Sequence, residues 1–215
     1  MLELDPDRLR LDPLLPRPMA VYRAEGSRIE FRFKPVGRGT ELLGRLPAGA
    51  RVGVVGPLGN GFPQPAAGAR AILVGGGTGI ASLFELAAEI PGAEVLLGGR
   101  TRDDIMGLDD FEALGCRLAL ATEDGSTGHR GLVTDLLEPR SGDEVYACGP
   151  TPMMRRAAEL ARAAGARCHV SLETHMACGF GVCLGCAVPT PAGYRYVCTH
   201  GPVFESETLE WDGLP

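Results

Sequence analysis

The sequence predicts a fold that combines α/β and β parts: a small β-barrel, a doubly wound parallel sheet and a carboxyl-terminal cysteine-loop module. Short strand-like segments separated by proline and glycine fill residues 1–66. Strands and helices then alternate from residue 71, and four closely spaced cysteines follow residue 177. A chain of 215 residues has room for such modules. We place their boundaries at residues 1–66, 67–167 and 168–215.

The amino-terminal module is expected to be β-rich. Residues 28–33 alternate between apolar and charged side chains, which is the period of a half-buried strand. Residues 19–22 and 51–55 are further strand candidates, and Thr40 is expected to cap a short helical turn. These segments predict a small barrel or a piece of one.

The middle module begins with a buried strand. Residues 71–74 form a continuous apolar run, as in a strand that is covered on both faces. A glycine turn follows, and then apolar side chains recur at helical spacing up to Ile90. Further strands are predicted at residues 95–97, 118–120 and 145–148, and a second helix at residues 153–164. The alternation indicates a doubly wound parallel sheet.

The glycine turn is a candidate nucleotide site. Such a turn exposes backbone N–H groups at the start of a helix, where a pyrophosphate binds well. The fingerprint G-x-G-x-x-G is absent because Ile80 stands where its last glycine belongs, so a tight turn without a ligand is the alternative. Residues 148–150 also follow a strand, and both turns are expected at the same sheet edge. Arg100 and Arg102 leave the choice between NAD and NADP open.

The carboxyl-terminal module carries a metal-binding pattern. The cysteines follow the spacing C-x4-C-x2-C, with a fourth one after eleven intervening residues: Cys178, Cys183, Cys186 and Cys198. This is the plant-type [2Fe–2S] spacing, since thiolates are the soft ligands that iron–sulfur clusters need. Glycines between the cysteines would let backbone N–H groups reach the sulfur atoms.

Two other interpretations of the cysteines are weaker. A structural zinc site usually has two close cysteine pairs, whereas only Cys183 and Cys186 form one here. A disulfide framework suits a short secreted chain, and this longer chain has an odd number of cysteines, seven.

Composition narrows the class of partner. The chain has 21 basic and 27 acidic residues and a net charge of −6, which does not favour nucleic-acid binding. The first residues lack the features of a secretory signal, and no apolar run has the length of a membrane span. We therefore expect a cytoplasmic protein without nucleic-acid or membrane partners.

Several motifs together resemble a known family. They are Arg17-Pro-Met-Ala20, Gly39-Thr40, Gly56-Pro-Leu-Gly-Asn-Gly-Phe62, Val74-Gly-Gly-Gly-Thr-Gly-Ile-Ala81, Ala121-Thr-Glu-Asp-Gly125, Tyr146-Ala-Cys-Gly-Pro150, Ser171-Leu-Glu173 and the cysteine loop with Cys198-x-x-Gly-Pro-Val-Phe204. From residue 17 onward the chain resembles the ferredoxin-reductase superfamily. Within it, the cysteine loop makes the chain similar to the electron-transfer subunits of NAD-linked dihydroorotate dehydrogenases.

The resemblance implies three cofactors and their binding residues. It implies FAD at Arg17, Pro18, Met19, Ala20, Arg32, Phe33, Lys34, Gly39 and Thr40. It implies NAD at Gly75, Gly76, Gly77, Thr78, Gly79, Cys148, Gly149 and Pro150. It implies a [2Fe–2S] cluster on the four cysteines already named. Only sixteen residues precede Arg17, fewer than the family has, so we expect an incomplete flavin barrel.

The resemblance also implies a partner. In the family, an FMN-containing catalytic subunit oxidises dihydroorotate for pyrimidine biosynthesis, and electrons pass through the cluster and FAD to NAD. The implied complex contains two copies of each subunit, and this chain supplies no catalytic acid or base. Phe180, Val182 and Leu184 are then expected to be exposed at the partner interface.

Two alternative functions remain open on sequence alone. The chain could be a stand-alone NAD(P)H reductase that serves another acceptor, because function depends on the site and the partner and not on the fold. It could also be a zinc-binding module without enzymatic activity.

Overall fold

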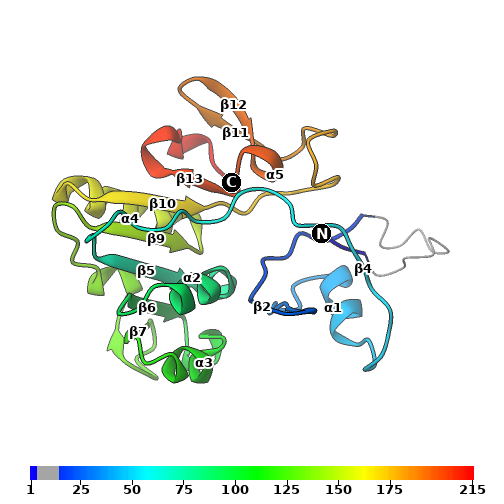
Figure 1. Cartoon of the computed structure of the whole chain (residues 1–215), viewed down its shortest axis with the longest axis horizontal. Coiled ribbons are helices and arrows are strands. Elements are labelled where there is room, and N and C mark those ends of the chain that lie inside the picture. Colours follow the sequence, from blue (N-terminus) through cyan, green and yellow to red (C-terminus); the bar gives the residue numbers. More distant parts are fainter. Residues whose placement is uncertain (4–14) are drawn as a thin grey trace.

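The computed structural model describes residues 1–3 and 15–215. Its centre is a seven-stranded sheet in the order β13-β10-β9-β5-β6-β7-β8 (Figure 1). The strands are β5 (Ala71–Gly76), β6 (Glu94–Gly99), β7 (Arg117–Thr122), β8 (His129–Arg130), β9 (Glu144–Cys148), β10 (Arg167–Ser171) and β13 (Val203–Glu205). All neighbours pair in parallel except β13 with β10. The predicted parallel sheet is confirmed.

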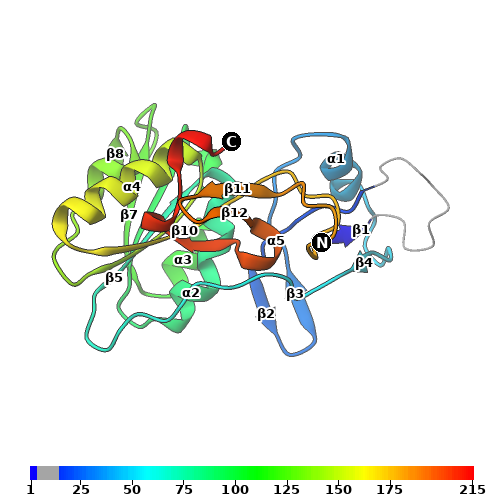
Figure 2. The ribbon, with the colours of Figure 1, turned by 90° about the horizontal axis from the view of Figure 1, so that it is seen from above.

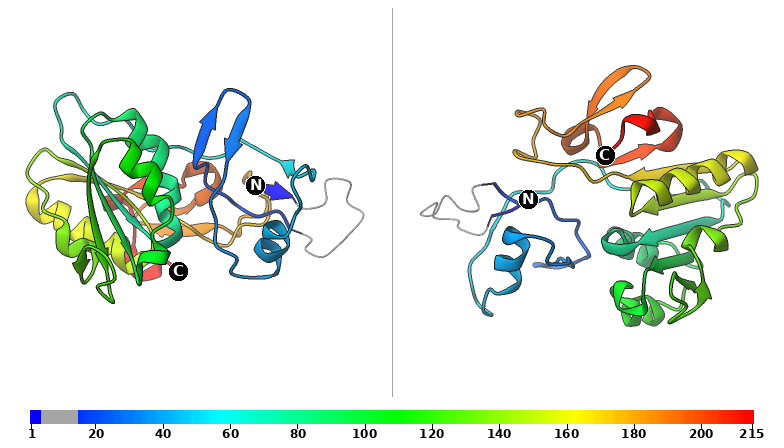
Figure 3. Two further views of the ribbon diagram at one scale, coloured as in Figure 1. Left: turned by 90° about the horizontal axis from the view of Figure 1, so that it is seen from below. Right: turned by 180° about the vertical axis from the view of Figure 1, so that it is seen from behind.

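Helices cover both faces of this sheet (Figure 3). They are η1 (Gly77–Leu83), α2 (Phe84–Glu89), η2 (Arg102–Asp104), α3 (Leu108–Ala113), η3 (Val133–Leu136) and α4 (Thr151–Ala164). One core contains Met154 and Ala157 of α4, and a second core on the other face contains Phe84 of α2 and Phe111 of α3. Among the described residues, no helix has the length and apolar character needed to cross a bilayer.

The amino-terminal module consists of short antiparallel pieces. β1 (Leu2–Glu3) pairs with β4 (Gly53–Val54), and β2 (Arg23–Glu25) pairs with β3 (Arg28–Glu30) in a hairpin that projects from the molecule (Figure 2). The strand predicted over residues 28–33 ends at Glu30, and Ile29 is 54% exposed. The expected burial of Ile29 is therefore wrong, because no sheet covers that face of the hairpin among the described residues.

A short helix follows this hairpin. α1 (Arg38–Gly44) begins beside Thr40, whose hydroxyl accepts hydrogen bonds from the backbone N–H groups of Val36 and Gly37 and donates one to the Gly37 carbonyl. Thr40 stabilises the helix start from inside the first turn, not from the N-cap position that the sequence suggested.

The carboxyl-terminal module packs against the edge of the central sheet. β11 (Ala187–Thr190) and β12 (Gly193–Tyr196) form a hairpin, and α5 (Val197–His200), η4 (Ser206–Thr208) and η5 (Trp211–Gly213) complete the module. The cysteine loop lies between β10 and β13 in the sequence. Since both strands belong to the central sheet, the loop is held close to that sheet.

Ionic and aromatic contacts fix the amino-terminal module on the central one. The Tyr22 ring stacks on Phe84 at a centroid distance of 4.5 Å, and its hydroxyl donates a hydrogen bond of 2.7 Å to Asp110. Arg23 and Arg32 pair with the same carboxylate. These contacts bring the predicted flavin residues to the edge of the sheet where the glycine turn lies.

Candidate functional site

A cavity of about 650 Å³ lies at the carboxyl edge of β5, β6 and β9. Gly76, Gly77, Thr78, Gly149 and Pro150 line it. The two turns meet because β5 and β9 are adjacent and parallel, with Gly75 opposite Cys148. A cavity lined by backbone groups at this edge is the expected place for a dinucleotide.

Three of the residues predicted to bind NAD do not line this cavity: Gly75, Gly79 and Cys148. They pack beneath the residues that do. A Cβ atom on Gly79 would lie 2.3 Å from the carbonyl oxygen of Cys148, so only glycine allows the two turns to approach. A Cβ atom on Gly75 would lie 3.0 Å from the Ile80 side chain, a tight but less severe contact. Cys148 is fully buried, and burial raises the pKa of its thiol to about 12, which makes it unreactive at neutral pH.

A second cavity, of about 300 Å³, lies between the modules. Of the residues predicted to bind FAD, seven line it: Pro18, Met19, Ala20, Arg32, Phe33, Lys34 and Thr40. Arg17 and Gly39 lie outside this lining and contact each other, since a Cβ atom on Gly39 would be 2.3 Å from the Arg17 Nε atom. Arg17 also donates a hydrogen bond to the carbonyl of Leu15.

The two cavities share part of their walls. Lys34, Thr78 and Glu173 line both of them. Desolvation by the surrounding protein raises the pKa of the Glu173 carboxyl. We did not predict Glu173 as a site residue, although it follows the end of β10 at the sheet edge where ligands bind.

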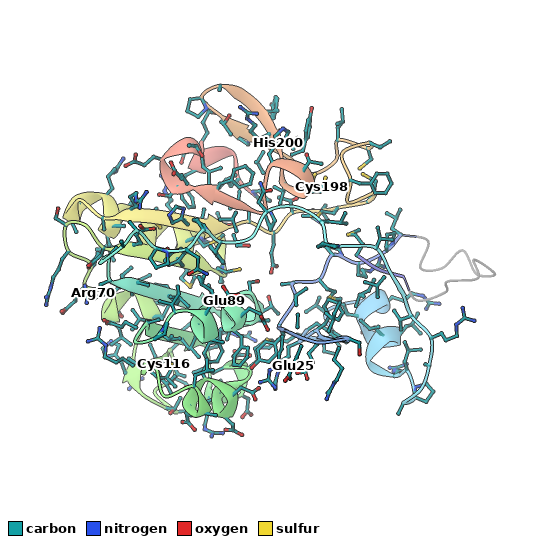
Figure 4. All side chains as sticks on the ribbon, in the orientation of Figure 1. Glu25, Arg70, Glu89, Cys116, Cys198 and His200 are labelled. Atoms are coloured by element: carbon teal, nitrogen blue, oxygen red, sulfur yellow. The ribbon has the colours of Figure 1, made fainter. Side chains whose placement is uncertain are left out.

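This second cavity also reaches the cysteine module. Met176, Gly179 and Cys198 line the cavity on that side. Figure 4 shows Cys198 on the side of the carboxyl-terminal module that faces the amino-terminal segment. A Cβ atom on Gly179 would contact the side chains of Met1 and Leu58, so the loop packs directly against that segment.

The four cysteines are arranged as two pairs. The Sγ atoms of Cys186 and Cys198 are 3.3 Å apart. Cys178 Sγ accepts a hydrogen bond from the backbone N–H of Cys183 at 3.4 Å and is also hydrogen-bonded to the Cys183 side chain. Among residues 1–3 and 15–215, no three Cys, His, Asp or Glu side chains are grouped tightly enough for one metal ion. Two thiol pairs suit a cluster in which each of two irons takes two cysteines better than they suit one tetrahedral zinc ion.

Backbone N–H groups surround the sulfur atoms. Hydrogen bonds from the N–H groups of Cys183, Phe180 and Val182 lower the pKa of Cys178 to about 6. Burial, together with the neighbouring Cys186, raises the pKa of Cys198 to about 11. The loop makes these contacts with Gly179 and Gly181 both at φ +84°, a conformation that side chains disfavour. This is the role that the sequence predicted for the loop glycines.

Known proteins agree with this arrangement. Residues 173–210 match a family model described as the iron–sulfur cluster binding domain of dihydroorotate dehydrogenase B. The dihydroorotate dehydrogenase B (NAD(+)) electron transfer subunit of Clostridium acetobutylicum is 37% identical over 199 residues, 93% of this chain and 81% of the relative. Its counterpart from Bacillus caldolyticus is 42% identical, over 91% of this chain and 80% of the relative. The chain belongs to this family.

A solved structure extends the family match. The structure of an NADH-dependent reduced ferredoxin-NADP oxidoreductase, described in connection with flavin-based electron bifurcation, is similar with a TM-score of 0.83 and 33% identity. The similarity covers 93% of this chain and 76% of that one. Family and structure together support an oxidoreductase subunit with a [2Fe–2S] cluster, FAD and NAD.

The residues present fit these groups chemically. Paired thiols with backbone donors fit an iron–sulfur cluster. The glycine-lined sheet edge fits a dinucleotide, because side chains there would obstruct its approach. The cavity between the modules offers apolar surface together with Arg32 and Lys34, which suits a flavin ring and its phosphates.

Asp104 is expected to make the stability of the fold depend on pH. Hydrogen bonds from Lys34 and Arg100 lower its pKa from 3.8 to about 2. A lowered pKa stabilises the fold above the unfolded value and loses that contribution as the pH falls through the folded value. We expect unfolding midpoints of Asp104→Asn, measured by denaturant titration, to depend less on pH between about 4 and 2 than those of the unsubstituted chain. Parallel curves for the two proteins would refute this role.

Proposed function

We propose that this chain carries electrons from a dihydroorotate-oxidising partner subunit to NAD, through a [2Fe–2S] cluster and FAD. The observation that carries the proposal is the position of the 300 Å³ cavity. It shares Lys34, Thr78 and Glu173 with the 650 Å³ cavity at the sheet edge, which we call the nucleotide cavity. On its other side it is lined by Cys198, one of the proposed cluster ligands. A flavin bound there would lie between the two other groups.

This order of groups makes chemical sense. An iron–sulfur cluster carries one electron and a hydride carries two, and bound FAD exchanges electrons in either form. The chain's own residues position the groups: Thr78 and the glycine turn hold the nicotinamide end, and Pro18 to Ala20 hold the flavin. Backbone donors around Cys178 stabilise negative charge on the cluster sulfur.

The cysteine loop is our candidate for the partner surface. Phe180, Val182 and Leu184 are 57%, 73% and 49% exposed, and Leu184 has a φ of +59° that is unusual for leucine. Three apolar side chains next to the cluster fit a protein interface better than they fit solvent. We propose that an FMN-containing catalytic subunit binds there, in a cytoplasmic complex with two copies of each chain.

Substitution of an exposed apolar residue in the loop should therefore weaken subunit binding more than it affects electron transfer within this chain. We expect Val182→Asp to weaken binding of the catalytic subunit at least tenfold, because a charge in the buried centre of an interface costs roughly 1–3 kcal/mol or more. NADH-to-dye electron transfer should remain. Titration calorimetry with the catalytic subunit and a dye assay measure the two effects.

Tyr194→Asp is the matched control for Val182→Asp. Tyr194 is 71% exposed on the β11–β12 hairpin of the same module, away from the cysteine loop. Binding that falls equally in both variants would show that the loop is not a specific interface.

Co-expression separates the proposed function from a stand-alone reductase. The proposal expects the chain to co-purify with a flavoprotein that oxidises dihydroorotate, and the pair to reduce NAD with dihydroorotate. Turnover of NADPH with an unrelated acceptor by this chain alone, without such a partner, would favour the reductase. Zinc without acid-labile sulfide would exclude both redox functions.

A further inference from the structure

The nucleotide cavity has two distinct ends. At one end, Thr78 and Glu173 also line the 300 Å³ cavity in which we propose that FAD binds, so the reactive nicotinamide belongs there. The opposite end is formed by Gly98 and Gly99 at the end of β6, by Glu123 after β7, and by the segment from Gly131 to Thr134. A dinucleotide with its nicotinamide at the flavin must place its adenosine half at this far end.

The far end has the features of an adenosine site. Leu132 is 57% exposed and lines the cavity, which gives the adenine ring an apolar surface. The backbone N–H of Glu123 donates to the carbonyl of Gly99 at 3.2 Å, so Glu123 lies directly beside the end of β6. In dinucleotide-binding sheets, a carboxylate near the end of a neighbouring strand accepts hydrogen bonds from the adenosine ribose.

The charges that line the cavity are unevenly paired. Each cation in the lining contacts a carboxylate: Lys34 and Arg100 share Asp104, and Arg156 lies 3.6 Å from Glu159. The carboxylate of Glu123 has no hydrogen-bond or ion-pair partner within the described part of the chain. The far end therefore presents a carboxylate that no protein group pairs within the described residues.

From this asymmetry we propose that Glu123 selects NAD over NADP. Its carboxylate accepts hydrogen bonds from the ribose hydroxyls of NAD and repels the 2′-phosphate that distinguishes NADP. A phosphate monoester carries roughly −1.5 to −2 charges at pH 7, so the repulsion is strong at contact distance. The Arg100 Nε atom pairs with Asp104 at 3.1 Å, and this contact offsets part of the positive charge nearby. The inference rests on the proposed position of the nicotinamide at the flavin.

Binding of oxidised nucleotides tests this inference without any turnover. NAD⁺ and NADP⁺ are titrated into the full chain loaded with oxidised FAD, and calorimetry gives the two dissociation constants. We expect Glu123→Gln to reduce the preference for NAD⁺ about tenfold, mainly by tightening NADP⁺ binding, and Glu123→Arg to reduce it further. Added salt should reduce the preference in the unsubstituted chain and have less effect in Glu123→Gln, because the repulsion is screened.

Asp124→Asn is the matched control. Asp124 is the adjacent acid, does not line the cavity, and accepts a hydrogen bond from the backbone N–H of Ser126. Its substitution should leave the preference within about twofold, the size of a long-range charge effect in water. If both Glu123→Gln and Glu123→Arg still bind NAD⁺ and keep the preference of the unsubstituted chain, Glu123 does not select the nucleotide. That result would leave the nucleotide site itself standing. Failure of the unsubstituted chain to bind either nucleotide would overturn the nucleotide site itself.

Discussion

Replacement of Cys186 by serine is expected to abolish electron transfer from dihydroorotate to NAD. Cys186 is 2% exposed, and its Sγ atom lies 3.3 Å from that of Cys198, so it belongs to one of the two thiol pairs. A serine hydroxyl is a hard, poorly acidic ligand and does not hold iron with bridging sulfide. The rate of electron transfer from dihydroorotate to NAD should fall by more than ~100-fold. Loss of a residue that only supports a metal ligand costs about 10–100-fold, and loss of the ligand itself should cost more.

The measurements for this variant are iron and sulfide content together with two activities. NADH-to-dye transfer does not need the cluster and should persist in Cys186→Ser. Cys168→Ser is the control, since Cys168 is also buried but lies in β10 outside the cysteine loop. A Cys186→Ser protein that keeps its iron, sulfide and dihydroorotate activity would show that Cys186 is not a ligand.

The second large effect is expected at Gly79, where the two turns of the nucleotide cavity touch. The methyl group of Gly79→Ala would lie 2.3 Å from the Cys148 carbonyl oxygen and 2.5 Å from the Gly149 nitrogen. Both neighbours are backbone atoms of a central strand and its turn, so neither can move cheaply. We expect a loss of ~3 kcal/mol in the free energy of unfolding, at the upper end for overpacking, and much weaker NAD⁺ binding.

Denaturant unfolding and calorimetry measure these two losses. Gly61→Ala is the control, because a Cβ atom there would meet nothing within 4 Å and its φ lies outside the left-handed region. An unfolding midpoint of Gly79→Ala equal to that of Gly61→Ala would contradict the close approach of the two turns.

The sequence predicted the central sheet well because its signals are local. The apolar run at residues 71–74 needs cover on both faces, and it became β5 with a core on each side. The predicted second helix is confirmed and extends two residues further toward the amino terminus, to Thr151. The meeting of residues 75–79 with residues 148–150 followed from the parallel pairing of their strands.

Tertiary context decided what the sequence could not predict. Alternation at residues 28–33 indicates a half-buried strand only if a sheet covers one face, and the β2–β3 hairpin leaves Ile29 exposed. Lys34 and Thr78 were assigned to different cofactors, and their shared position became visible only in the folded chain. Glu173 and Glu123 both lie in motifs that carry the family resemblance, but such a motif does not show which side chain lines a cavity. That depends on the modules that surround each residue.

The central claim is that one chain aligns a cluster, a flavin and a nicotinamide nucleotide. Anaerobic purification together with the catalytic subunit, followed by assay of iron, acid-labile sulfide and flavin, tests it most directly. We expect about two irons, two sulfides and one FAD per copy of this chain. Iron and sulfide without FAD, even in the complex, would break the proposed path and contradict the account.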